Sequence, residues 1–208
     1  MNDLQLLFSF IAAVFLLAIA PGPDNIYVAF HSLKYGFKSG CYIVLGLMTG
    51  CLFHSSLLAL GFSVFLSEFP LLFSSIKLLG AAYLIYLAYS LFRRGAPKNL
   101  STGAVRDKKP FELFKQGLLM NLLNPKVSMF FLALFPGFLF LPGQPLWIQF
   151  MLLGFVFILV STLVFSIIAL LASRILNSLS KPSSYFLKAI HWTQIALFIG
   201  MAFFLFLL

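Results

Sequence analysis

The sequence predicts an all-α membrane protein with six transmembrane helices, arranged as two inverted three-helix repeats whose first helices are broken. Three observations lead to this fold class. Hydrophobic residues make up 62% of the 208 residues and charged residues only 9%, which is more apolar surface than a soluble domain of this length can bury. Apolar segments long enough to span a bilayer recur along the chain, and basic residues cluster in alternate connections between them.

Six apolar segments are long enough to cross a membrane. At about 1.5 Å per residue, a helix needs about 20 apolar residues to cross a hydrocarbon core about 30 Å thick. The segments lie at residues 4–30, 40–66, 70–92, 113–135, 146–171 and 185–208. They form a first three-helix repeat over residues 1–92 and a second over residues 113–208. Residues 93–112 are hydrophilic and are expected to form a flexible cytoplasmic linker.

The distribution of basic residues predicts the topology. Two lie between the first and second segments, seven between the third and fourth or within the first few residues of the fourth, and three between the fifth and sixth or within the first few residues of the sixth, which accounts for twelve of the 14. The positive-inside rule places these connections in the cytoplasm and both termini outside. Five or seven spans would scatter the same charges over both sides. The net charge of +9 is therefore attributed to topology, and no nucleic-acid partner is expected.

The first segment of each repeat is interrupted at prolines. A proline inside a helix frees backbone groups, and in lipid these cost several kcal/mol each unless protein or water satisfies them. Matching interruptions in an inverted repeat predict a binding site near the membrane midplane, although prolines can also simply kink a helix. The candidate residues at the two breaks are Pro21, Gly22, Pro23, Asp24 and Asn25, and Asn121, Asn124, Pro125 and Lys126.

Charged residues inside the segments are further candidates for the site. Asp24 is the only acid within a span, and an intramembrane acid is a functional candidate by default. It can accept a substrate ammonium group, carry a proton, pair with a lysine or cap the second half-helix. Lys77 and Lys126 are candidates for a substrate carboxylate or for pairing with Asp24, with snorkelling the alternative for Lys77. His54 can relay protons or pack as a neutral residue.

Small residues and cysteines of the second segment are interpreted mainly as packing residues. Gly46 and Gly50 form a small-residue motif that lets helices approach closely. Packing within the chain is favoured, and a homodimer is permitted without being required. Cys41 and Cys51 lie about 15 Å apart on one helix, too far for a disulfide. No cofactor, metal site or enzyme active site is expected, since no Ser/His/acid order or phosphate-binding loop stands out.

These features together resemble the LysE/RhtB family of amino-acid exporters, the LysE-type translocators. The resemblance covers about residues 5–137 and rests on Pro21-Gly22-Pro23, on Gly36, Gly40, Gly46 and Gly50 leading to His54, on Lys77-x-x-Gly80-Ala81-Ala82-Tyr83-Leu84, on Gly117, and on Asn121-x-x-Asn124-Pro125-Lys126 with Phe130-Phe131. It implies six transmembrane helices in a bacterial inner membrane, where the outer side that the basic residues predict for both termini is the periplasm. It also implies export of amino acids or their derivatives, driven by the proton gradient.

The leading hypothesis is therefore a proton-coupled secondary transporter that exports a small zwitterionic substrate, an amino acid. Asp24 would bind the ammonium group or the proton, and exposed amides of the broken helices would help to hold the carboxylate. A dibasic substrate would need more acids, so a neutral one is favoured. The alternatives are an intramembrane thiol electron carrier, which would use Cys41 and Cys51, and a metal-cation exporter, for which few ligands are available.

Overall fold

Prolines and glycines set the ends of the helices. The computed structural model describes residues 3–20, 22–62, 70–95, 109–175 and 184–207. Proline is the first residue of four of its helices, because proline lacks an N–H and its fixed φ suits the first helical turn. Gly36 joins two consecutive helices with a φ of 86°, a backbone conformation that favours glycine. The Gly36 N–H bonds the Ser32 carbonyl and closes the first of these helices.

All regular structure among the described residues is helical. Each of the six predicted segments is helical where it is described, and the two proline-containing segments are divided as expected. The elements are α1 (Asp3–Ile19), α2 (Pro23–Tyr35), α3 (Phe37–Leu57), the π-helix η1 (Leu58–Phe62), α5 (Pro70–Arg94), α6 (Pro110–Leu122), α7 (Pro125–Met129), the π-helix η2 (Phe130–Leu134), the 3-10 helix η3 (Phe135–Phe138), α8 (Leu146–Ile175) and α9 (Ser184–Leu207).

Within the described ranges, two helices have the length and hydropathy of a membrane span. They are Phe37–Leu60 and Leu146–Arg174. Two bent pairs also qualify if each pair is one span, which raises the number to four: α1 with α2, bent by 60°, and α6 with residues 126–138, bent by 50°. Large apolar side chains such as Phe8, Leu60 and Phe155 are exposed on the outside, as expected for a surface that faces lipid.

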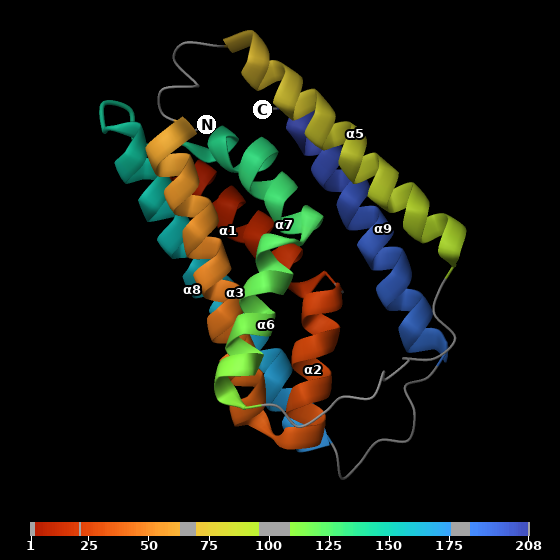
Figure 1. Ribbon diagram of the computed structural model, residues 1–208. Helices are drawn as coiled ribbons and strands as arrows, with labels where there is room; N and C mark the ends of the chain where they lie inside the picture. The colour runs from red at the N-terminus through yellow and green to blue at the C-terminus, as the bar shows by residue number, and fades with distance from the viewer. Residues whose placement is uncertain (1–2, 21, 63–69, 96–108, 176–183, 208) are drawn as a thin grey trace.

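The helices pack around a core in which α3 and α8 are central. Helix α3 contacts α6, α8 and α2, while α8 also contacts α1 and α2; α5 and α9 form a pair of their own (Figure 1). Both chain ends lie at one end of the bundle, and the α2–α3 junction, the start of α6 and the end of α8 lie at the other (Figure 1). The helix ends at this second end carry basic residues, including Lys34, Lys38 and Arg174.

An aromatic cluster holds α1 against the second half of the chain. Phe10 of α1 packs edge-on against Phe135 and Phe138, with ring centroids 5.2 and 5.3 Å apart. Phe131 lies 4.7 Å from Phe135 and 4.8 Å from Phe157 of α8. Because aromatic side chains bury large apolar areas and prefer such tilted arrangements, the cluster fixes α1, η2 and α8 relative to one another.

Glycines bring α3 and α6 into close contact, as the predicted small-residue motif requires. A Cβ atom at Gly46 would overlap the backbone oxygen of Phe114 and approach the Leu118 nitrogen to 2.7 Å. A Cβ atom at Gly117 would likewise overlap the Ile43 carbonyl oxygen. The two glycines face each other's helices, so this part of the motif serves packing within the chain.

We expect Gly46→Ala to lower the free energy of unfolding by about 1–3 kcal/mol, because the added methyl group meets rigid backbone. The measurement is the thermal unfolding midpoint of the purified protein in detergent. Gly200→Ala is the matched control, since a Cβ atom at Gly200 of α9 meets nothing within 4 Å. Equal midpoints for the two variants would contradict the close α3–α6 contact.

Candidate functional site

The two helix breaks meet in the interior and are joined by a hydrogen bond. Asp24 lies in the first turn of α2, and Asn124 is the N-cap residue of α7. The Asn124 Nδ2 atom donates to Asp24 Oδ2 at 2.6 Å, and Asn124 Oδ1 accepts from the Lys126 backbone N–H at 3.0 Å. Asn124 therefore caps α7 and orients Asp24 at the same time.

The structure corrects one interpretation of Asp24. The N-cap residue of α2 is Gly22, and no side chain caps this helix. The Asp24 side chain instead turns toward the second break, where Asn124 binds it. The interpretation of Asp24 as a simple N-cap is wrong, because Asp24 lies two residues beyond the N-cap position and its carboxylate accepts a hydrogen bond from Asn124 of the second break.

The carbonyl groups at the end of α1 are satisfied by side chains from both breaks. Lys126 Nζ donates to the Ala20 carbonyl oxygen at 2.9 Å, and Asn25 Nδ2 donates to the Ala18 carbonyl oxygen at 2.7 Å. A helix C-terminus carries partial negative charge and unpaired carbonyls, so a cation is favourable there. Lys126, only 8% exposed, thus acts as a cap for α1.

Asp24 and Lys126 lie in the same cavity without touching. Their opposite charges attract each other, but within the described residues each charged group bonds elsewhere, Asp24 to Asn124 and Lys126 to Ala20. The predicted pairing of Asp24 with a lysine is therefore electrostatic rather than a direct ion pair. The two charges oppose each other, while one carboxylate oxygen of Asp24, Oδ1, has no hydrogen-bond partner in the described part of the chain.

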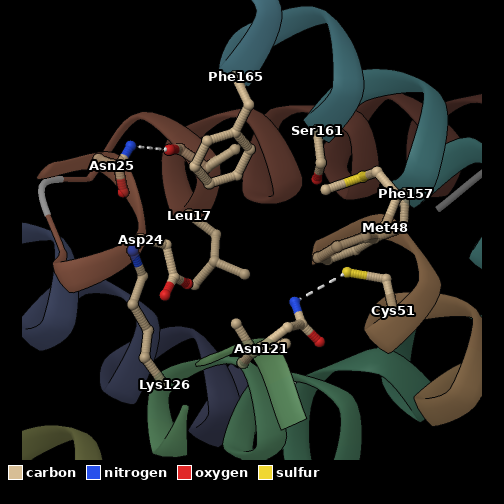
Figure 2. A pocket seen from close by; sticks show the side chains of 12 residues that line it. Leu17, Asp24, Asn25, Met48, Cys51, Asn121, Lys126, Phe157, Ser161 and Phe165 are labelled. Carbon is tan, nitrogen blue, oxygen red and sulfur yellow. Dashed lines mark hydrogen bonds between the residues drawn. The ribbon is translucent and has the colours of Figure 1, made fainter. Parts of the chain in front are cut away.

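The cavity between the breaks is small and has a polar and an aromatic side. Its free space is about 20 Å³, enough for one or two water molecules. Figure 2 shows Asp24 and Lys126 on one side of it and Ser161 with Phe157 on another. The buried oxygens along its wall that have no described partner are Asp24 Oδ1, Asn121 Oδ1 and Ser161 Oγ.

Asn121 is held by the second helix of the first half. Its Nδ2 atom donates to the Cys51 sulfur at 3.2 Å. A Cβ atom at Gly50 would come within 2.7 Å of the Asn121 Cγ atom, so Gly50 leaves the space that this amide occupies. Cys51 is buried, and both Cys51 and Cys41 are free thiols.

Of the other predicted site residues, those that the structure describes in full are not among the residues that line the cavity. His54 does not line it; its imidazole stacks on Phe131 with ring centroids 5.2 Å apart and interacts with the backbone of Asn121. Gly22 and Pro23 begin α2 beside the cavity, and Pro125 begins α7. Lys77 lies on α5, but its side chain and that of Pro125 lie outside what the structure describes, as does all of Pro21.

Sequence reasoning missed the contribution of α8. Phe157, Ser161 and Phe165 line the cavity, and their spacing of four residues places them on one helix face. The available signal was Ser161, one of three hydroxyl residues in an otherwise apolar segment. Without knowing which helices pack together, that face could not be assigned to the site. Among the described residues, no three His, Cys, Asp or Glu side chains are grouped so that they can hold a metal ion.

Comparison with known proteins identifies similar chains. A family model described as LysE type translocator matches residues 15–208. The chain is 34% identical over 175 residues to a homoserine/homoserine lactone efflux protein of Salmonella typhimurium, covering 84% of each chain. It is 38% identical over 148 residues to the uncharacterized membrane protein YrhP of Bacillus subtilis, covering 66% of this chain and 70% of that one. No solved structure matches the chain. These names indicate a transporter rather than an enzyme.

The electrostatic balance of the cavity can be tested with a double-mutant cycle. We expect Lys126→Met to lower the free energy of unfolding by about 3–5 kcal/mol, because it leaves a buried carboxylate without its counter-charge. Asp24→Asn should also destabilise, whereas the double variant should lose less than the sum of the two. Thermal unfolding midpoints in detergent measure these effects, with exposed Lys115→Met as the control. Strictly additive losses would show that the two charges are not coupled.

Proposed function

The chain belongs to the LysE type translocator family, and from this premise we propose that it exports amino acids or small amino-acid derivatives across a bacterial inner membrane. The observation that carries the proposal is the meeting of two broken helices at a buried cavity. Two hydrogen bonds join the breaks there, from Asn124 to Asp24 and from Lys126 to Ala20, and each links residues that lie about 100 positions apart in the chain. Broken helices around a polar site are typical of secondary transporters.

We propose that the chain crosses the membrane six times, as inverted repeats over residues 1–92 and 113–208 joined by residues 93–112. Two features support this. The bent pairs α1–α2 and α6–α7 occupy corresponding positions in the two halves. The packing between the halves is also reciprocal. The second span of the first half, α3, contacts α6 at the start of the second half, and the second span of the second half, α8, contacts α1 and α2 at the start of the first. The basic helix ends share one end of the bundle (Figure 1), which on the positive-inside rule is cytoplasmic and puts both termini in the periplasm.

The proposed substrate is a neutral amino acid. Asp24 and Lys126 balance each other's charge in the cavity, so a zwitterion adds no net charge whereas a dibasic substrate adds one. The Salmonella relatives are named for the efflux of homoserine and homoserine lactone. These two compounds share a primary amine, but only homoserine has a free carboxylate. Homoserine is therefore the first substrate to test.

Asp24 offers a simple means of coupling export to protons. A carboxylate that has one free oxygen can bind either a substrate ammonium group or a proton, and the two exclude each other. Deprotonated Asp24 would bind substrate from the cytoplasm, and protonation from the outside would release it. The cavity of about 20 Å³ is too small for a whole amino acid, so the half-helices must separate during transport.

We expect Asp24→Asn to abolish export that is driven by a pH gradient, because an amide neither ionises nor attracts an ammonium group. The assay is efflux of labelled homoserine, followed by the other amino acids, from proteoliposomes with an imposed gradient. Glu112→Gln, an exposed acid at the start of α6, is the matched control and should retain the wild-type rate. Wild-type export by Asp24→Asn would refute the role of Asp24.

Replacing both cysteines tests the thiol-carrier alternative. We expect Cys41→Ala/Cys51→Ala to retain at least about half of the wild-type export rate, because both thiols are free and the Cys51 sulfur accepts a single weak hydrogen bond from Asn121 among the described residues. Thermal midpoints measured alongside show whether any loss reflects unfolding. Complete loss of function in a stably folded double variant would favour thiol chemistry instead.

A further inference from the structure

The face of α8 that lines the cavity carries a buried hydroxyl group between two aromatic rings. Ser161 is 1% exposed, and its Oγ atom has no hydrogen-bond partner among the described residues. Phe157 and Phe165 lie one turn before and one turn after it and are also buried. Leaving a buried hydroxyl unpaired costs about 1–3 kcal/mol, so a hydroxyl placed in the wall of a cavity indicates a polar ligand there.

A second unpaired oxygen lies across the same space. Asp24 is 5% exposed, and its Oδ1 atom has no partner within the ranges that the structure describes, whereas Asn124 donates to Oδ2. Figure 2 shows the Asp24 and Ser161 side chains on opposite sides of the open space. The third unpaired oxygen of the wall, Asn121 Oδ1, lies against the backbone of Gly50. Asp24 and Ser161 therefore present two acceptors to one ligand.

The chemistry of these groups selects a small cationic donor. Two unpaired oxygen acceptors, one of them a carboxylate, are best satisfied by a group that carries several N–H donors and a positive charge. Phe157 and Phe165 line the same space, and aromatic rings attract cations. The space of about 20 Å³ fits one group of the size of water or ammonium. Lys126 does not fill this role in the structure, since its Nζ atom donates to Ala20 while Asp24 Oδ1 and Ser161 Oγ have no partner among the described residues.

We propose that Asp24, Ser161, Phe157 and Phe165 form a subsite for the ammonium group of the transported substrate. This inference rests on the proposed export function and names the substrate class as primary amines. The substrate carboxylate is then not required for binding at this subsite, and its removal is tolerated. Ser161 is the specificity-determining residue. An ammonium group uses the acceptors of both Asp24 and Ser161, whereas a proton that binds Asp24 does not use Ser161.

The test measures ligand binding separately from transport. Dissociation constants are determined in detergent for homoserine, homoserine methyl ester, which lacks a free carboxylate, and N-acetylhomoserine, which lacks the ammonium group. The proteins are wild type, Ser161→Ala and Ser166→Ala; Ser166 lies on α8 but does not line the cavity. Efflux of labelled homoserine from proteoliposomes is measured on the same preparations.

We expect wild type to bind homoserine and its methyl ester at least about tenfold more tightly than N-acetylhomoserine. Ser161→Ala should weaken binding of both amines about tenfold, the effect of losing one hydrogen bond to a charged group, and Ser166→Ala should not. Equal binding of N-acetylhomoserine, no binding of either amine, or unchanged affinities in Ser161→Ala would overturn the subsite.

The two levels of the proposal fail differently in this experiment. Selective amine binding that depends on Ser161 but is accompanied by no efflux would uphold the subsite and refute the exporter function. Efflux of homoserine with affinities that ignore Ser161 would uphold the exporter function and refute the subsite. Phe165→Leu gives a further check, because loss of the ring should weaken amine binding about threefold while leaving the hydroxyl in place.

Discussion

The structure depends on how two interrupted helices satisfy backbone groups that lipid cannot satisfy. Each break supplies what the other lacks. Lys126 of the second break caps the carbonyl of Ala20 in the first, and Asn124 binds Asp24. In an apolar environment these bonds cannot be exchanged for bonds to solvent. These bonds therefore favour the arrangement in which the two breaks lie together, and the cavity lies where they meet.

Close packing of α3 against α6 makes this meeting possible. Gly46 and Gly117 let the two helices touch at their backbones, and Gly50 leaves room for the Asn121 amide. A larger residue at any of these positions would move α6, and with it the start of α7 that carries Asn124 and Lys126. The glycines thus affect the site indirectly. They set the position of Asn124 and Lys126, whose hydrogen bonds require donor–acceptor distances of about 3 Å.

Much of this arrangement could be predicted from the sequence because it depends on local chemistry. Prolines interrupt a helix whichever helices pack against it, so the two breaks could be predicted without knowledge of the packing. A lone acid in an apolar segment is likewise exceptional in any fold. The partners were harder to predict. Asn124 as donor to Asp24 and Lys126 as cap for Ala20 depend on which helix faces meet, which periodicity does not specify. The same limit concealed Ser161, whose hydroxyl becomes significant only because α8 faces the breaks. The six-span arrangement remains a prediction.

In the proposed export cycle, the occupied oxygen of Asp24 would let one carboxylate serve two ligands in turn. Asn124 binds Oδ2, so the proposed proton and ammonium ligands would both use Oδ1. Sharing a single atom makes the two exclusive, which coupling requires and which a carboxylate with both oxygens free would not guarantee. Asn124 is also the cap of α7, so a movement of this half-helix would release Oδ2 as well. The affinity of Asp24 for its ligand is in this way tied to the position of the second break.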